Sequence, residues 1–117
     1  MTIVVTGGCG FVGTALTRSL LELKSRIVLL DVNPPISDLA AQVTFIPTDI
    51  TDKEAVIKAF EKCSEITCVF HVAGFGLAGT SNLPAYNKRT LKVNLEGTKN
   101  IIEACIKFNV EALGKNT

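Results

Sequence analysis

Three glycines spaced three residues apart follow the first apolar run of the chain. They are Gly7, Gly10 and Gly13, and the apolar residues 3–5 come shortly before them. After the glycines, apolar side chains recur at helical spacing, which predicts a helix over residues 11–23. A strand that turns through glycine into a helix leaves backbone N–H groups at the positive end of the helix dipole. Such a turn can bind a diphosphate.

Each glycine has a distinct task in such a turn. Gly7 permits the tight turn, Gly10 lets the backbone approach the ligand without a Cβ in the way, and Gly13 lets helix and strand pack closely. Glycines also mark ordinary turns, so the spacing alone is a weak signal. The strand–turn–helix context, with an acid at the required distance, favours dinucleotide binding.

That acid is Asp31, which ends a second apolar run at residues 27–30 and lies 21 positions (31 − 10) after Gly10. A carboxylate at this strand end can accept hydrogen bonds from the adenosine ribose hydroxyls. A 2′-phosphate beside it would cost about 4 kcal/mol at ~4 Å and an effective dielectric near ~20, so the residue predicts NAD rather than NADP. The alternative is a turn or capping aspartate ahead of Pro34 and Pro35.

Composition narrows the class of protein. The 117 residues allow one domain with a core, and 47% of them are hydrophobic. The net charge is +1, from 12 basic and 11 acidic residues without a basic cluster, which argues against nucleic-acid binding. No apolar stretch has the length of a signal peptide core or a membrane span, so a cytoplasmic or cytosol-facing protein is expected. Four cysteines without zinc-type spacing predict reduced thiols and no metal site, namely Cys9, Cys63, Cys68 and Cys105.

Alternating apolar runs and helical patterns predict an α/β fold. Strands are expected at residues 2–6, 27–31, 43–46 and 67–71, and helices at 11–23, about 51–63 and 85–109. Thr51 and Glu54 have the spacing of a capping box at the start of the second helix. Four strands separated by crossovers predict a Rossmann-type, doubly wound parallel sheet of order 3-2-1-4, incomplete in this chain. The lone His71 ends the fourth run without a partner ligand in the sequence, so we interpret it as structural.

In this sheet order, the ligand crevice lies at the carboxyl ends of the first and fourth strands. Asp49 and Ile50 follow the third strand, where Asp49 can accept from the adenine amino group and Ile50 can pack on the ring. A simple turn acid is the alternative for Asp49. Beyond the fourth strand, Val72, Ala73 and Gly74 are small residues where the middle of the cofactor must pass close to the backbone.

These residues resemble the extended short-chain dehydrogenase/reductase family. TGGCGFVG at 6–13 is similar to the family's TGGxGFxG, and matching segments are DI at 49–50, HVAG at 71–74 and VNLEGT at 93–98. The segment 68–105 is especially similar to the 3β-hydroxysteroid dehydrogenase/isomerase branch. The resemblance implies an NAD-dependent oxidoreductase that acts on a hydroxyl or keto group of a lipophilic, steroid-like substrate.

The resemblance also implies roles for individual residues. The diphosphate would lie against Gly7, Gly10, Phe11, Val12 and Gly13. Asp31 would bind the ribose, and Asp49 and Ile50 the adenine, while Val72, Ala73 and Gly74 would border the cofactor. Asn94 matches a helix asparagine that ties backbone groups near the site, with an ordinary polar helix position as the alternative.

The catalytic pattern of that family is not found in this sequence. The family uses a Tyr-x-x-x-Lys pair and a serine, whereas the one tyrosine here is Tyr86 and the residue four positions on is Thr90. Residues 111–117 are interpreted as a polar tail outside the family, after an NAD-binding half-domain at 1–110. We therefore expect a cofactor-binding half without its catalytic half.

Without a further strand, the fourth strand would be an exposed apolar edge, through residues 68–70. Such an edge predicts self-association or pairing with a full-length relative. A non-catalytic NAD-binding or interaction module, or an inactive truncated product, is the alternative function.

Overall fold

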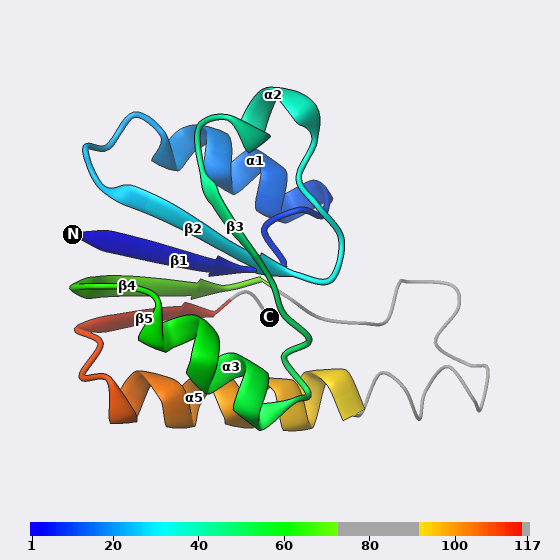
Figure 1. Cartoon of the computed structure of the whole chain (residues 1–117), viewed down its shortest axis with the longest axis vertical. Helices are drawn as coiled ribbons and strands as arrows, with labels where there is room; N and C mark the ends of the chain where they lie inside the picture. The colour runs from blue at the N-terminus through cyan, green and yellow to red at the C-terminus, as the bar shows by residue number, and fades with distance from the viewer. Residues whose placement is uncertain (73–91, 116–117) are drawn as a thin grey trace.

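A parallel sheet forms the centre of the structure, a computed structural model that describes residues 1–72 and 92–115. The sheet has five strands in the order β3-β2-β1-β4-β5, and neighbouring strands run parallel (Figure 1). The strands are β1 (Thr2–Thr6), β2 (Arg26–Asp31), β3 (Thr44–Pro47), β4 (Ile66–His71) and β5 (Ala112–Lys115). The Rossmann-type α/β fold and the order of the first four strands are thus as predicted.

Helices cover both faces of this sheet. Helix α1 (Phe11–Leu20) and the short α2 (Ser37–Ala40) lie on one face. Helix α3 (Lys53–Glu61) lies on the other face with α5 (Thr98–Lys107), which continues from a π-helical turn, η1 (Lys92–Gly97) (Figure 1). The predicted helix over 85–109 is therefore observed from residue 92, and residues 85–91 lie outside the described part of the chain.

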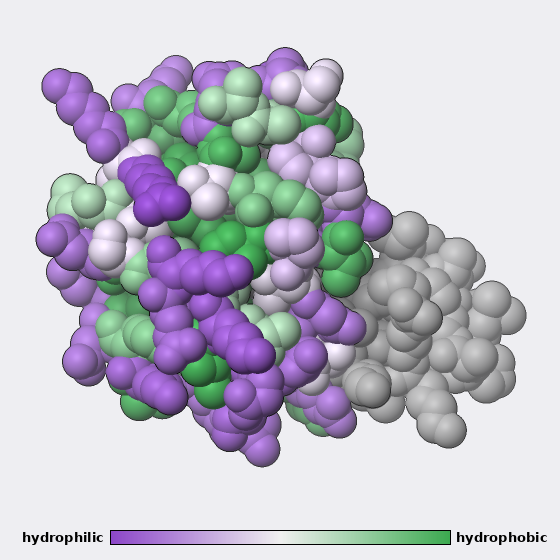
Figure 2. All heavy atoms as spheres, viewed as in Figure 1, coloured by the Kyte–Doolittle hydropathy of each residue, from purple (hydrophilic) through white to green (hydrophobic). Residues whose placement is uncertain are grey.

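Alternating side chains of the strands enter two core layers. Val4, Val28 and Val69 pack with α3 and α5, whereas Ile3, Val5 and Leu29 pack with α1. Because both faces are covered, all five residues of β1 are buried, which explains its unbroken apolar run. The outer surface of α3 is mostly polar (Figure 2), whereas Ile102 and Ile106 of α5 are exposed. Among the described residues, no helix has the length and apolar character needed to cross a membrane.

The start of α3 differs from the predicted capping box. Asp52 is the N-cap residue, and its Oδ1 accepts a hydrogen bond of 3.2 Å from the Ala55 N–H. Thr51 lies one residue before this N-cap, and its hydroxyl donates to Asp49 Oδ1 at 2.7 Å. The capping interaction of Thr51 with Glu54 was therefore a wrong prediction, although the helix itself is present.

The fifth strand corrects the expected four-stranded sheet. After α5 the chain turns at Asn109, which has a left-handed φ of 53°, and residues 112–115 then pair with β4. Gly114 lies against Phe70, and a Cβ at this glycine would be 3.1 Å from the ring. Strand β4 is consequently internal, and the predicted exposed edge at residues 68–70 does not exist. The division of the chain at residue 110 stays a prediction, but the segment after it contributes a strand to the same sheet.

Candidate dinucleotide site

The glycine turn connects β1 to α1 at the carboxyl end of the sheet. Gly7 adopts a left-handed φ of 70°, a conformation that favours glycine. Its N–H donates to the Leu30 carbonyl at 2.8 Å, so the turn is fixed to the end of β2. The Gly10 N–H donates back to the Gly7 carbonyl at 3.3 Å, which closes the turn.

Gly13 is required by packing within the protein. A Cβ there would lie 2.1 Å from the Gly7 carbonyl oxygen and 2.6 Å from the Gly8 Cα, both backbone atoms. No side-chain adjustment can relieve such a contact. Gly13 therefore sets how closely α1 passes the turn, as predicted.

Gly10 differs because neither its conformation nor its surroundings require glycine. Its φ of −83° and ψ of −175° are extended values that any residue adopts. Among the described residues, the atom nearest to a Cβ there is the Gly7 carbonyl oxygen, at an ordinary 3.7 Å. The missing Cβ thus keeps open a space that the described part of the protein does not fill.

The amino end of α1 faces this open space. Gly10 is its N-cap and offers no side-chain hydrogen bond, and the first turn contains no acidic residue. The first intrahelical bond runs from the Thr14 N–H to the Gly10 carbonyl at 2.8 Å. The N–H groups before Thr14 have no acceptor within the helix, and the dipole favours an anion beside them. Phe11 is 93% exposed and Val12 50% exposed, so solvent reaches this end of the helix.

Asp31 lies beside the glycine turn, as its spacing predicted. Its Oδ2 accepts from the Cys9 N–H at 3.1 Å, and its Oδ1 accepts from the Val32 N–H at 2.7 Å and the Asn33 N–H at 3.2 Å. The carboxylate thus stabilises the turn after β2, the simpler of the two interpretations. It also holds the glycine turn against the strand end, a contact that the sequence analysis missed. Its bond to a ribose stays a prediction.

Asp49 and Ile50 lie on the segment that leads from β3 to α3. Asp49 is exposed, and its Oδ1 accepts from the Thr51 N–H at 3.0 Å, the geometry of a turn acid. Ile50 is only 6% exposed, and a Cβ at Gly97 would lie 2.5 Å from its Cδ1. The Ile50 side chain therefore packs against Gly97 at the end of η1 and belongs to the core cluster that includes Ile101 of α5. The adenine contacts of both residues stay predictions.

The carboxyl end of β4 is tied to that of β1. His71 is 3% exposed, its Nδ1 lies 2.6 Å from Thr6 Oγ1, and its Nε2 lies 2.9 Å from Thr98 Oγ1. The Val72 N–H donates to the Thr6 carbonyl at 3.1 Å. His71 is thus a buried, hydrogen-bonded residue, in line with the structural interpretation. No sequence signal pointed to its two threonine partners.

The other candidate residues are only partly covered by the structure. Asn94 lies exposed on η1 next to α5, and its proposed contact with backbone groups stays a prediction. Ala73, Gly74, Tyr86 and Thr90 lie outside the described residues. Within the described ranges, no group of three His, Cys, Asp or Glu side chains could hold a metal ion.

The four cysteines are free thiols with raised pKa values. Burial, and secondarily the charge of Asp31, raises the pKa of Cys9 to about 11. Burial, and secondarily the neighbouring Cys68, raises the pKa of Cys105 to about 11. Burial also raises the pKa values of Cys63 and Cys68. These thiols are therefore protonated at neutral pH and are weak nucleophiles.

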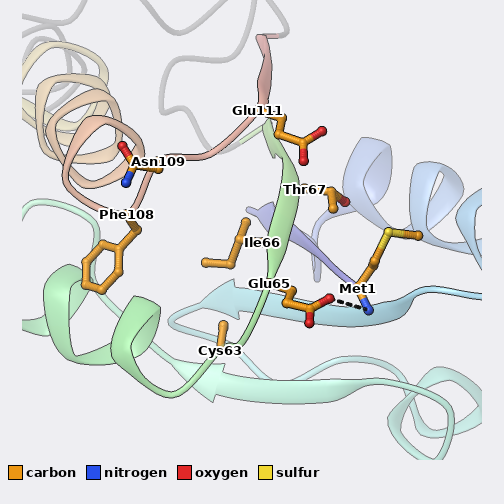
Figure 3. A pocket seen from close by; sticks show the side chains of 8 residues that line it. All are labelled: Met1, Cys63, Glu65, Ile66, Thr67, Phe108, Asn109 and Glu111. Carbon is orange, nitrogen blue, oxygen red and sulfur yellow. Dashed lines mark ion pairs between the residues drawn. The ribbon is translucent and has the colours of Figure 1, made fainter.

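A cavity of about 400 Å³ lies at the opposite end of the sheet, where β1 and β4 begin (Figure 3). Ile66 and Phe108 form its apolar side, and the Met1 ammonium lies 3.9 Å from Glu65 Oε2 at its rim. Because the glycine turn and Asp31 lie at the other rim, this cavity is separate from the dinucleotide site.

Comparisons with known proteins agree with this geometry. The model of the NAD dependent epimerase/dehydratase family matches residues 3–114. Short-chain dehydrogenase/reductase family 42E member 1 of Danio rerio is 39% identical over 96% of this chain, and a 3-beta-hydroxysteroid dehydrogenase of Mycolicibacterium neoaurum is 35% identical over 87%. The chain spans 28% of the length of each of these relatives.

Solved structures show the same fold. UDP-glucose 4-epimerase of Thermus thermophilus, in complex with NAD, matches 97% of this chain with a TM-score of 0.84 and 32% identity. The corresponding enzyme of Thermotoga maritima matches 98% with a TM-score of 0.86 and 26% identity. This chain covers 36% and 37% of those two chains, respectively.

Proposed function

Because the chain belongs to the NAD-dependent epimerase/dehydratase family, we propose that it is the NAD-binding part of an oxidoreductase. The observation that carries the proposal is Gly10, whose missing Cβ serves no packing need among the described residues and leaves space at the uncapped end of α1. The helix dipole favours a negatively charged group such as a diphosphate at this position. Its two phosphates would accept hydrogen bonds from the first N–H groups of α1.

Asp31 would then bind the adenosine ribose and favour NAD over NADP. Its carboxylate lies 3.1 Å from the Cys9 N–H and so stands directly beside the turn that would hold the diphosphate. A 2′-phosphate would approach this negative charge at a cost of about 4 kcal/mol. Asp49 and Ile50 would lie toward the adenine, and Val72, Ala73 and Gly74 along the middle of the cofactor.

We further propose hydride transfer to or from a hydroxyl or keto group of a lipophilic, steroid-like substrate. Identity of 35% to a 3-beta-hydroxysteroid dehydrogenase supports this substrate class. NAD, when bound, supplies the hydride chemistry, and the residues of this chain bind and orient it. Because Tyr86 is followed four positions on by Thr90, we expect these 117 residues alone to be inactive. The four free cysteines suit the reducing cytosol as its compartment.

A non-catalytic NAD-binding or interaction module is the second candidate function. It would bind NAD at the same glycine turn without turning over a substrate. A pull-down with a full-length relative would separate the two functions, because an interaction module should capture the relative. Reduction of NAD by these 117 residues with an alcohol would refute the non-catalytic module and the expected inactivity of this part.

Calorimetric titration with NAD tests the proposed site. We expect binding in the micromolar to low-millimolar range, and Gly10→Ala should abolish it while leaving the melting temperature unchanged, because a Cβ there meets the described residues at an ordinary 3.7 Å. Ser19→Ala, at the exposed far part of α1, is the matched control and should bind as the wild type does. Undiminished binding by Gly10→Ala would refute the site.

The same titration with NADP tests the role of Asp31. The wild type should prefer NAD by up to about a thousandfold, and Asp31→Asn should reduce this preference because the charge is lost while an acceptor oxygen remains. Equal affinity of the wild type for both dinucleotides would contradict the proposed preference.

A further inference from the structure

The histidine at the end of β4 connects this strand with β1 and α5. His71 is 3% exposed and lies between Thr6, the last residue of β1, and Thr98, the first residue of α5. Its Nδ1 is 2.6 Å from Thr6 Oγ1 and its Nε2 is 2.9 Å from Thr98 Oγ1. An apolar side chain would fill this position without the desolvation cost of burying an imidazole. The hydrogen bonds to Thr6 and Thr98, both described residues, therefore give a reason for a histidine that packing alone does not.

Thr6 is the residue from which the glycine turn begins. Its side chain is fully buried, and its carbonyl accepts from the Val72 N–H at 3.1 Å. Because Gly7 follows directly, the position of Thr6 sets where the turn leaves the sheet. The hydrogen bond to His71 Nδ1 thus joins the end of β4 to the strand end that carries the turn.

Resting on the proposed function, we propose that His71 is a positioning residue for the NAD diphosphate. Through Thr6 it fixes the start of the glycine turn. The bond from Nε2 to Thr98 attaches α5 to the same point but does not reach the turn. The two ring nitrogens therefore have different consequences for NAD binding.

Two substitutions separate these nitrogens. An asparagine carries its polar atoms at about the position of Nδ1, and a glutamine at about that of Nε2. His71→Asn should retain the bond to Thr6 and bind NAD within about threefold of the wild type. His71→Gln should lose the bond to Thr6 and bind NAD about tenfold more weakly than the wild type. This fold-change corresponds to the net free energy of about one hydrogen bond. Each variant gives up one of the two bonds to threonine, so the two are matched controls for each other.

Threonine variants complete the test. Thr98→Val removes the partner of Nε2 and should leave NAD affinity within about threefold of the wild type. Thr6→Val should weaken NAD binding about as much as His71→Gln, and the double variant should be no weaker than either single one, because the same bond is lost.

The position of the glycine turn can also be measured without NAD. Hydrogen exchange of the Gly7 N–H, which donates to the Leu30 carbonyl at 2.8 Å, should accelerate in His71→Gln but not in His71→Asn. The proposal would be overturned if the Gly7 N–H exchanged equally fast in His71→Gln and His71→Asn, and if each variant lost NAD affinity only in proportion to its loss of unfolding free energy. A wild type that fails to bind NAD would instead refute the proposed function, and the exchange measurement would still decide whether His71 positions the turn.

Discussion

Cys9 lies inside the glycine turn, yet its surroundings make it a poor nucleophile. Burial, and then the neighbouring Asp31 carboxylate, raises its pKa to about 11, and burial has the same effect on Cys105. The thiolate is the reactive form of cysteine, so its population at neutral pH is very small. The thiols of Cys9 and Cys105 should also make the free energy of unfolding depend on pH in alkali.

These pKa values predict a loss of stability in alkali. A thiol whose pKa is raised by folding, here from 9.0 to about 11, stabilises the fold fully below pH 9. That contribution disappears as the pH rises from 9 to 11, because the unfolded chain releases its protons first. Urea midpoints should stay constant from pH 7 to about 8.5 and fall above pH 9. Thiolate absorbance of the native protein that titrates near pH 9 would contradict this prediction.

At the scale of elements, the first turn of α3 offers a direct test of its observed cap. Asp52 Oδ1 accepts from the Ala55 N–H at 3.2 Å, whereas the Thr51 hydroxyl is bonded to Asp49. Asp52→Ala should lower the free energy of unfolding by about 1 kcal/mol, measured by urea denaturation. Thr51→Ala is the matched control and should lower the free energy of unfolding by less than Asp52→Ala does. A larger loss in Thr51→Ala would favour the capping box predicted from the sequence.

Elements were predictable where the local pattern alone determines them. Buried apolar runs identified β1, β2 and β4, because strands covered on both faces need such runs. Strand β5 has no comparable run, and Gly114 lies within it. Its strand structure comes from pairing with β4, in a register that matches Cys68 to Ala112. A strand that forms by pairing with its neighbour in this way cannot be predicted from its own sequence.

At the scale of the whole molecule, the site was predictable as far as chain topology determines it. Right-handed crossovers bring the ends of parallel strands to one edge, so the glycine turn and Asp31 were expected together. The bonds of His71 to Thr6 and Thr98 span 65 and 27 residues, respectively. They depend on side-chain packing after the sheet has assembled. Spacing along the sequence holds no information about such contacts.

The fifth strand should protect the molecule from self-association. Removal of residues 111–117 would leave β4 as an edge, with unpaired backbone groups beside Cys68, Val69 and Phe70. We expect a lower urea midpoint than that of the full chain and oligomers in light scattering. Removal of residues 116–117 alone leaves the pairing of β4 with β5 intact and should change neither measurement. A shortened chain that stays monomeric and equally stable would show that β5 contributes nothing to the sheet in solution.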